Sequence, residues 1–305
     1  MTKKTWLLKC FQKWAVLEDR VKEKNFMEEF ESYLLGNLPE VKSFHPYFQK
    51  ALVEMLKAGG KRFRPYLLLS VVNSYEPLLV KNSFGAAAAV EYIHTYSLIH
   101  DDLPIFDDAD FRRGHPTLHV TYEEVTATLV GDALNTHAFY LIADSPLSDS
   151  VKTKLTKELS LNGGAYGMVL GQAIDCYFEN KTLDFEKLKF LHIHKTAKLI
   201  AASLKMGAVI ANLSKECADT LYDIGINLGL LFQIEDDLID ATKSSKEAGK
   251  PTNNDTVKNS FVNLFGIEGT KKKKEQMLHL LDEELSVLNP TLKSKLQKII
   301  NKYFK

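Results

Sequence analysis

Apolar residues recur at spacings of three and four along most of this chain. The periodicity predicts helices in six stretches, at residues 45–58, 83–100, 120–142, 151–178, 186–212 and 216–241. Alternation of apolar and polar residues, which would indicate strands, is essentially absent. The nine prolines fall at helix starts or at breaks, and no break is as long as a linker between domains. The pattern therefore predicts a single all-α domain over residues 1–305.

Size, charge and cysteine content narrow the class of protein. A chain of 305 residues that is 45% hydrophobic can bury a large core, and its formal net charge of zero gives no argument for a nucleic-acid partner. Cys10, Cys176 and Cys217 are far apart and match no metal-binding spacing, which fits a reducing cytoplasm. No apolar run reaches the roughly 18 residues of a membrane span. We therefore expect a cytoplasmic protein without a transmembrane segment.

The N-terminal segment is basic and only partly apolar. Lys9, Gln12 and Lys13 interrupt its apolar residues, so a signal peptide is a poor interpretation. The apolar spacing favours an amphipathic helix that packs on the body of the protein. Met27 is a second candidate start, and residues 1–26 are then an N-terminal extension. Both interpretations stay open at this point.

Three aspartates lie toward the end of each of two apolar stretches. The clusters occur in HDDLPIFDDADFRRG and in FQIEDDLID, and they comprise Asp101, Asp102, Asp107, Asp236, Asp237 and Asp240. Pro104 breaks the first helix, and the turn that follows should return Asp107 toward the helix end. In the second cluster, spacings of three and four residues bring the carboxylates onto one helix face. Negative charge is disfavoured at the C-terminal end of a helix, so a solvated acidic surface explains these clusters poorly.

A divalent cation would relieve the repulsion and the burial cost within these clusters. Magnesium binds through a few carboxylates, water and the phosphate oxygens of a substrate. Calcium is the rival cation, but the chain contains no loop with EF-hand spacing. We therefore predict magnesium held between the two clusters, where it bridges a phosphorylated ligand.

Basic motifs suited to phosphate accompany the aspartates. The segment GGKRFRP at residues 59–65 places three cations after a flexible glycine pair, and Arg112 and Arg113 directly follow the first cluster. Lys195 and Lys250 add further cations. Each motif alone reads as ordinary surface charge, so its meaning comes from its combination with the aspartates.

Two further features have competing interpretations. His94 lies about two helical turns before Asp101 and hence on the same face, either as a satisfied core histidine or as a hydrogen-bond donor to a phosphate. The run Lys271–Lys274 opens a C-terminal helix, where we expect a solvated face.

Taken together, these motifs resemble the trans-polyprenyl diphosphate synthases. They occur in the family's order and cover residues 45–260; they are GGKRFRP (59–65), His94, SLIHDDLPIFDDADFRRG (97–114), GQAID (171–175), HKTAKLI (194–200), FQIEDDLID (232–240) and GKP (249–251). The DDxxxxD form of the first aspartate motif is similar to that of bacterial farnesyl diphosphate synthases. The resemblance implies an isoprenoid-synthase-type helical bundle around a central cavity, and a homodimer.

The resemblance also implies roles for individual residues. It implies magnesium, three ions per site, at Asp101, Asp107 and Asp236, supported by Asp102, Asp237 and Asp240. It implies contacts to the allylic diphosphate at Arg112, Lys195, Thr196, Gln233 and Lys250, of which Lys195, Thr196 and Gln233 also stabilise the reacting cation. It implies contacts to isopentenyl diphosphate at Lys61, Arg64, His94 and Arg113. Tyr96 and Ser97, one turn before Asp101, are implied to limit product length.

One departure from the family pattern affects the second cluster. Glu235 stands where the family more often has Arg or Gln, so its extra negative charge puts metal affinity there in question.

The activity implied by the resemblance is magnesium-dependent condensation of isopentenyl diphosphate with dimethylallyl and then geranyl diphosphate, which yields farnesyl diphosphate and pyrophosphate. Alternatives are a geranylgeranyl diphosphate synthase and a non-catalytic subunit of a heteromeric prenyltransferase. A terpene cyclase of similar fold fits less well, because DDLID at 236–240 lacks the serine or threonine and glutamate of its second metal motif.

Overall fold

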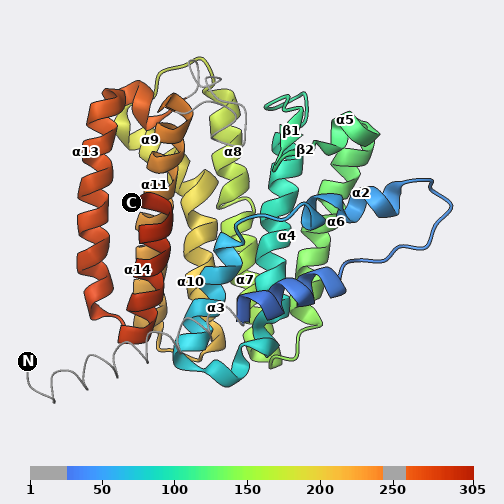
Figure 1. The fold of residues 1–305 in the computed structure, drawn as a ribbon, viewed down its shortest axis with the longest axis horizontal. Coiled ribbons are helices and arrows are strands. Elements are labelled where there is room, and N and C mark those ends of the chain that lie inside the picture. Colours follow the sequence, from blue (N-terminus) through green and yellow to red (C-terminus); the bar gives the residue numbers. More distant parts are fainter. Residues whose placement is uncertain (1–25, 243–258) are drawn as a thin grey trace, which may run out of the picture. The chain divides into compact units, whose positions relative to one another are not determined.

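The computed structural model describes residues 26–242 and 259–305, and helices dominate them (Figure 1). The chain divides after Pro39 into two compact units. In the first unit, residues 26–36 form a helix in which Phe26, Phe30 and Leu34 follow one another at intervals of four residues and share one face. The expectations for residues 1–25, and for Lys250, fall outside the described residues.

The second unit holds the remaining described elements. In chain order they are α2 (Phe48–Lys57), α3 (Phe63–Tyr75), η1 (Pro77–Leu79), η2 (Lys81–Ser83), α4 (Phe84–Asp101), β1 (Phe111–Arg112), β2 (His115–Pro116), α5 (Leu118–Tyr122), α6 (Glu124–Ala143), α7 (Asp149–Gly163), α8 (Met168–Tyr177), α9 (Phe185–His192), η3 (Ile193–Ala197), α10 (Lys198–Ile210), α11 (Lys215–Thr242), α13 (Phe261–Glu284), η4 (Leu285–Val287) and α14 (Pro290–Phe304). The element η3 is a π-helical turn, called the π-turn below. β1 and β2 pair antiparallel as a two-residue hairpin. The all-α prediction is confirmed.

The structure corrects three predicted helices. The stretch 120–142 is divided between α5 and α6 at Glu123, whose φ is 113°. The stretch 151–178 is two helices, because the chain breaks between α7 and α8. A Cβ atom at Gly167 would lie 1.9 Å from the carbonyl oxygen of Asn162, so the chain passes too close to the end of α7 for a larger residue. The stretch 186–212 is interrupted by the π-turn. Helix α13 is kinked at Gly266, and the run Lys271–Lys274 lies near the start of the part that follows the kink.

Helices α4, α10 and α11 form the interior of the second unit. Residues 86–90 of α4, an alanine run closed by Val90, are almost fully buried, and α10 buries residues on all sides. Helix α11 approaches α10 closely because Gly225 and Gly229 face Ala201 and Ala197, where a Cβ atom would lie 2.3 and 2.4 Å from the opposing Cα atoms. Small residues therefore set the helix spacing next to the site described below.

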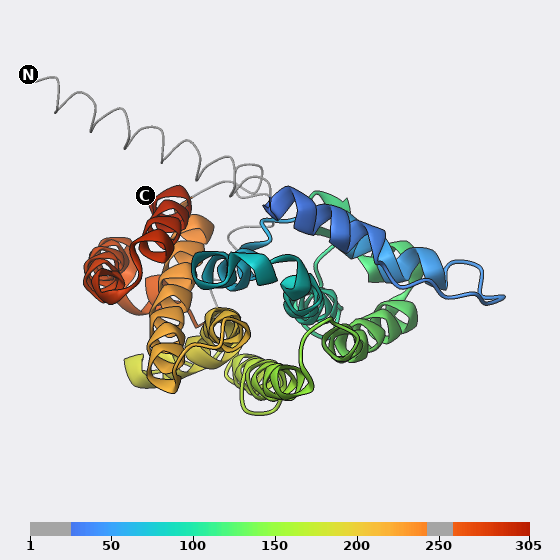
Figure 2. The same cartoon turned by 90° about the horizontal axis from the view of Figure 1, so that it is seen from below.

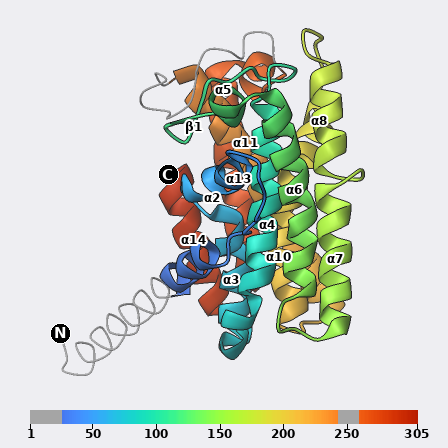
Figure 3. The ribbon, with the colours of Figure 1, turned by 90° about the vertical axis from the view of Figure 1, so that its right-hand side faces the viewer.

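The helices around this interior run largely alongside one another. Figure 2 shows several of them nearly end-on, and Figure 3 shows α6 and α7 side by side. One apolar cluster joins α3, α10, α11 and α14, and a second joins α9, α11 and the start of α13. Among residues 26–242 and 259–305, no helix combines the length and apolar character needed to cross a membrane.

Candidate active site

A cavity of about 970 Å³ lies among α4, the β1–β2 hairpin, α8, the π-turn and α11. It gathers most of the predicted site residues, which come from segments far apart in the sequence. Those that line it are Arg64, His94, Tyr96, Ser97, Asp101, Asp107, Arg112, Lys195, Thr196, Gln233, Asp236, Asp237 and Asp240. Lys61, Asp102 and Arg113 do not line it.

The first aspartate cluster forms where α4 ends. Asp101 is the last residue of the helix, and the turn through Pro104 returns the chain so that the Asp107 amide donates to the Asp101 carbonyl at 2.9 Å. The predicted return of Asp107 is confirmed. Burial raises the pKa of Asp101 to about 6; Lys195 opposes this shift and Asp107 adds to it. A carboxyl group with this pKa lacks sufficient positive charge nearby, which is the condition that a bound cation would relieve.

Asp102 has a different environment from its neighbour. It is buried, and its Oδ1 accepts hydrogen bonds from Nε of Arg112 at 2.8 Å and from Nη2 at 2.5 Å. Burial raises the pKa of Asp102, although Arg112 opposes that shift. The pair anchors Arg112 so that the rest of its guanidinium lines the cavity. Asp102 therefore orients Arg112, whose contact to a phosphate stays a prediction.

The second cluster lies on α11 and lines the same cavity. Asp236, Asp237 and Asp240 all line the cavity, as their spacing predicts. Asp237 is buried; its Oδ1 accepts from the Gln233 amide at 2.8 Å and its Oδ2 from the backbone N–H of Phe261 at 2.7 Å. These bonds tie α11 to the start of α13. Asp237 thus holds two neighbouring parts of the wall in place.

Glu235 points away from this cluster. It does not line the cavity, and its carboxylate forms an ion pair with Lys274 of α13 at 2.6 Å. The charge that was expected to disturb metal binding is therefore neutralised by a helix that packs against α11. The expectation of a solvated lysine run holds for Lys271 and Lys272, which are exposed, whereas this contact largely covers Lys274.

The π-turn brings Lys195 and Thr196 to the cavity. A turn of this kind carries an extra residue, and such turns are frequent at functional sites. The hydroxyl of Thr196 donates to Oε1 of Gln233 at 3.0 Å, and the Gln233 amide donates to Asp237. This chain of hydrogen bonds fixes which end of the Gln233 amide is oxygen. The carbonyl dipole and the hydroxyl thus have defined orientations beside the cavity.

Lys195 is held by a partner that the sequence motifs did not single out. Its ammonium donates to Oδ2 of Asp175 on α8 at 2.5 Å. Burial alone would lower the pKa of Lys195, but Asp175 and Asp101 outweigh that effect and raise it. Lys195 is therefore fully charged at neutral pH. The sequence indicates Asp175 only as part of the GQAID segment, and the fold is needed to show that it contacts Lys195.

A second group of basic residues occupies the other part of the cavity wall. Arg64 is only 7% exposed and its Nε has no hydrogen-bond partner in the structure. Burial lowers the pKa of Arg64 to about 10. His94 lines the cavity nearby, and its pKa is well below 6.5, chiefly because of burial and then the positive charges of Arg64, Arg113 and Arg112. A neutral imidazole beside a guanidinium whose Nε has no hydrogen-bond partner is suited to bind an anion through hydrogen bonds.

Lys61 and Arg113 lie behind this part of the wall. Lys61 is exposed, with its ammonium 5.1 Å from the centre of the Tyr303 ring. Nη1 of Arg113 donates to the carbonyl oxygens of Met55 and Gly59 at 3.1 and 2.6 Å. Their assignment to a phosphate contact stays a prediction.

Tyr96 and Ser97 line the cavity one helical turn before Asp101. Tyr96 is 7% exposed, and its ring meets that of His100 edge-on at 5.7 Å between centroids. Burial and then Asp101 raise the pKa of Tyr96 to about 12, so the phenol is neutral. The hydroxyl of Ser97 donates to the His94 carbonyl and leaves a small side chain at the wall. Tyr96 is the bulkier of the two neighbours at this level of the cavity.

The carboxylates surround the cavity without forming a ready-made metal cage. Within the described part of the chain, no three histidine, cysteine or acidic side chains are close enough to hold an ion by themselves. The donor set is nevertheless all oxygen and comes from two separate segments of the cavity lining, which suits magnesium that also binds a phosphorylated ligand.

Comparison with known proteins agrees with this geometry. The chain is 40% identical to farnesyl diphosphate synthase of Micrococcus luteus over 252 residues, covering 81% of this chain and 86% of the relative. It is 38% identical to geranylgeranyl pyrophosphate synthase 3 of Arabidopsis thaliana over 254 residues, covering 80% and 69% respectively. The crystal structure of Helicobacter pylori geranyltransferase complexed with magnesium and isoprenyl diphosphate superposes with a TM-score of 0.89 at 46% identity, covering 92% of this chain and 96% of the other. The pattern of the polyprenyl synthetase family matches residues 45–300, and this chain belongs to that family.

Proposed function

We propose that the protein is a prenyltransferase that condenses isopentenyl diphosphate with dimethylallyl and then geranyl diphosphate to give farnesyl diphosphate. The observation that carries this function is one cavity lined by aspartates of α4, of the turn after α4 and of α11, together with the buried Arg64 and the half-buried His94. The aspartate clusters would bind a diphosphate through magnesium, and Arg64 and His94 would bind one directly. These two different regions correspond to the two diphosphate substrates. Relatives named farnesyl diphosphate synthase, at 40% identity or more, support the same reaction.

The allylic diphosphate lies between the two aspartate clusters. Asp101, Asp107 and Asp236 would hold magnesium there, and the metal would supply a Lewis acid for the leaving diphosphate. Arg112, which Asp102 anchors, and the charged Lys195 bind the same group. Burial raises the pKa of Asp101, and Asp107 adds to this shift; a bound cation would relieve both effects.

Departure of the diphosphate leaves a positively charged allyl group. Thr196 and the Gln233 carbonyl, oriented by their mutual hydrogen bond, present negative ends of dipoles to this charge. Isopentenyl diphosphate is held by Arg64 and His94, with Lys61 and Arg113 behind them, so its double bond faces the cation. Apolar wall residues such as Met168 and Val169 limit the access of water, which would otherwise quench the cation.

Product length follows from the wall beneath Asp101. A chain that grows along α4 meets the ring of Tyr96, which is neutral, buried and at the cavity surface. This position of a large ring favours a fifteen-carbon product over the twenty-carbon product of a geranylgeranyl diphosphate synthase.

The direct test is the reaction itself. Purified protein with magnesium, dimethylallyl diphosphate and labelled isopentenyl diphosphate should release pyrophosphate, and chromatography of the dephosphorylated products should give farnesol. Geranylgeraniol as the main product would support the longer synthase instead. No release of pyrophosphate by the protein alone would support the non-catalytic subunit, an interpretation that the intact aspartate and GGKRFRP motifs disfavour.

Further expectations stay predictions. The family resemblance implies three magnesium ions per site and a homodimer, and the sequence pattern predicts a cytoplasmic location and a single domain over residues 1–305. Gel filtration with light scattering measures the assembly, and anomalous diffraction from manganese-soaked crystals counts the ions.

A further inference from the structure

Glu91 is a buried carboxylate outside the cavity that no part of the proposed reaction uses. It lies on α4, is 1% exposed, and does not line the cavity. It precedes His94 by three residues, so the two side chains leave neighbouring positions on the helix. A lone acidic residue within the apolar segment AAAAVEYIH has to be paired to be stable there.

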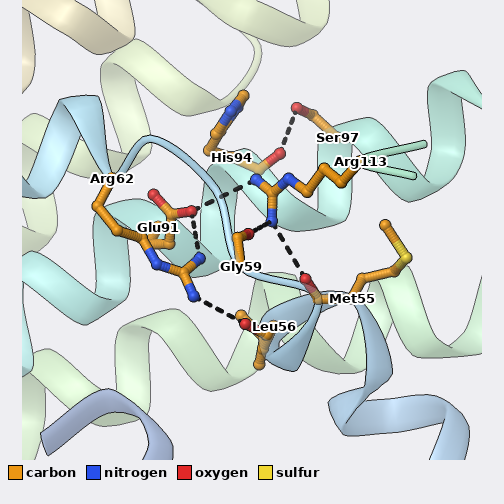
Figure 4. Close-up of polar contacts among 8 residues, drawn as sticks. All are labelled: Met55, Leu56, Gly59, Arg62, Glu91, His94, Ser97 and Arg113. Carbon is orange, nitrogen blue, oxygen red and sulfur yellow. Dashed lines mark hydrogen bonds and ion pairs between the residues drawn. The ribbon is translucent and has the colours of Figure 1, made fainter. Parts of the chain in front are cut away.

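Two arginines from different loops supply the pairing. Nη1 of Arg62 lies 2.9 Å from Oε1 of Glu91, and Nη2 of Arg113 lies 3.5 Å from the same atom. Figure 4 shows the two guanidiniums reaching Glu91 from opposite sides. Arg62 belongs to the GGKRFRP loop and Arg113 to the β1–β2 turn, so one carboxylate joins two loops that are about fifty residues apart in sequence.

The backbone around this contact is also constrained. Arg62 and Arg113 have φ of 47° and 55°, a left-handed conformation that persists for such residues only where the surroundings enforce it. Arg62 donates to the Leu56 carbonyl at 2.8 Å, and Arg113 donates to the carbonyls of Met55 and Gly59. Both arginines therefore fix the loop between α2 and α3, which delivers Lys61 and Arg64.

Arg113 also packs closely on the loop at Gly60. A Cβ atom at Gly60 would lie 3.1 Å from Cζ of Arg113, so the guanidinium packs directly on the glycine backbone. Glu91 thus holds Arg62 and Arg113, and these two arginines hold the loop between α2 and α3. That loop in turn sets the position of Arg64 at the cavity.

We propose that Glu91 is a positioning residue for the isopentenyl diphosphate subsite: its carboxylate aligns Arg62 and Arg113, and through them the loop that presents Lys61 and Arg64. The inference rests on the proposed function. A positioning role for Glu91 and a simple effect of its charge predict opposite changes in diphosphate binding when Glu91 is replaced. Removal of a negative charge near an anion-binding site would strengthen diphosphate binding through space, whereas loss of the alignment weakens it.

The test measures binding of isopentenyl diphosphate without an allylic partner, so that no reaction takes place. In isothermal titration calorimetry, Glu91→Gln should weaken binding by at least about tenfold, the effect of losing one charge-assisted hydrogen bond. In steady-state assays the KM for isopentenyl diphosphate should rise similarly, while the KM for geranyl diphosphate stays within about twofold. Glu91→Asp, which keeps the charge on a shorter arm, should recover part of the loss.

A matched control is Glu284→Gln, because Glu284 is a partly covered helical carboxylate that accepts from Asn227 and lies outside the cavity. It should leave both KM values unchanged. If Glu91→Gln does not fold, Arg62→Lys serves instead, since it keeps the charge but cannot contact Glu91 and Leu56 together; it too should weaken binding of isopentenyl diphosphate selectively.

Unchanged or tighter binding in Glu91→Gln would overturn the inference, and so would an equal rise in both KM values. A wild-type protein that does not bind isopentenyl diphosphate would overturn it as well. A wild-type protein that binds isopentenyl diphosphate but forms no prenyl product would instead refute the proposed function, while the binding comparison would still decide the role of Glu91.

Discussion

Gly171 is the point at which α8 approaches the π-turn most closely. A Cβ atom at this position would lie 2.1 Å from the backbone nitrogen of Lys195 and 2.4 Å from its Cα, whereas real contacts of this kind stay beyond 3.0 Å. Gly171→Ala must therefore displace the backbone of Lys195 by about 1 Å. A displacement of about 1 Å at reacting groups can lower a rate by roughly a hundredfold. Overpacking should also lower the free energy of unfolding by about 1–3 kcal/mol.

Two other glycines separate these effects. Gly225→Ala makes a comparable clash with Ala201, 2.3 Å from its Cα, but between α10 and α11 away from the reacting end, so it should destabilise the fold with a smaller loss of activity. Gly36→Ala meets nothing within 4 Å and should leave both properties unchanged. The assay is kcat with saturating substrates at a temperature below every melting transition, together with urea denaturation. Near wild-type kcat in folded Gly171→Ala would refute the idea that the π-turn backbone sets the position of Lys195 and Thr196.

Three other variants test separate parts of the site. Tyr96→Ala should shift the products toward twenty carbons, as measured by chromatography, and unchanged chain lengths would remove Tyr96 as the limit. Asp101→Asn should stabilise the metal-free protein at pH 7.5 by at most about 3 kcal/mol, the value of a pKa raised from 3.8 to about 6. A raised carboxyl pKa contributes stability that is present below pH 3.8 and is lost as the pH rises through about 6. The stability advantage of Asp101→Asn should therefore fall to about half at about pH 5. Thermal melts with a chelator measure this difference, and a variant that is no more stable than wild type at pH 7.5 contradicts the prediction. Glu235→Gln should leave the magnesium dependence of activity unchanged but cost about 1 kcal/mol of stability through the lost pair with Lys274; a changed magnesium optimum would show that Glu235 acts on the metal.

The sequence predicts the parts of the site that depend on local geometry. Pro104 ends α4 and returns Asp107, and the three- and four-residue spacings place Asp236, Asp237 and Asp240 along one wall, as the structure shows. These features follow from helix periodicity and from the missing N–H of proline, and both act within a few residues.

The sequence does not predict the contacts that orient these groups. The Lys195–Asp175, Arg62–Glu91 and Glu235–Lys274 pairs join residues that are 20 or more positions apart on different elements. The apolar periodicity of 186–212 also gives no sign of the π-turn, because its extra residue is stabilised by packing against α8 rather than by local preference.

The π-turn has a consequence for the whole fold. Its additional residue offsets α9 and α10 by about 100°, the angle of one residue in a 3.6-residue turn. Leu188 and Leu191 consequently pack in the apolar cluster with α13, while Ile200 and Leu204 pack in the cluster with α3 and α14. Helices α9 and α10 thus follow one another almost without a break, but their apolar faces point into two different hydrophobic clusters. A single-residue deletion anywhere in 193–197 would put one half out of register, so the fold, as distinct from the activity, should tolerate substitutions in this segment more readily than changes of length.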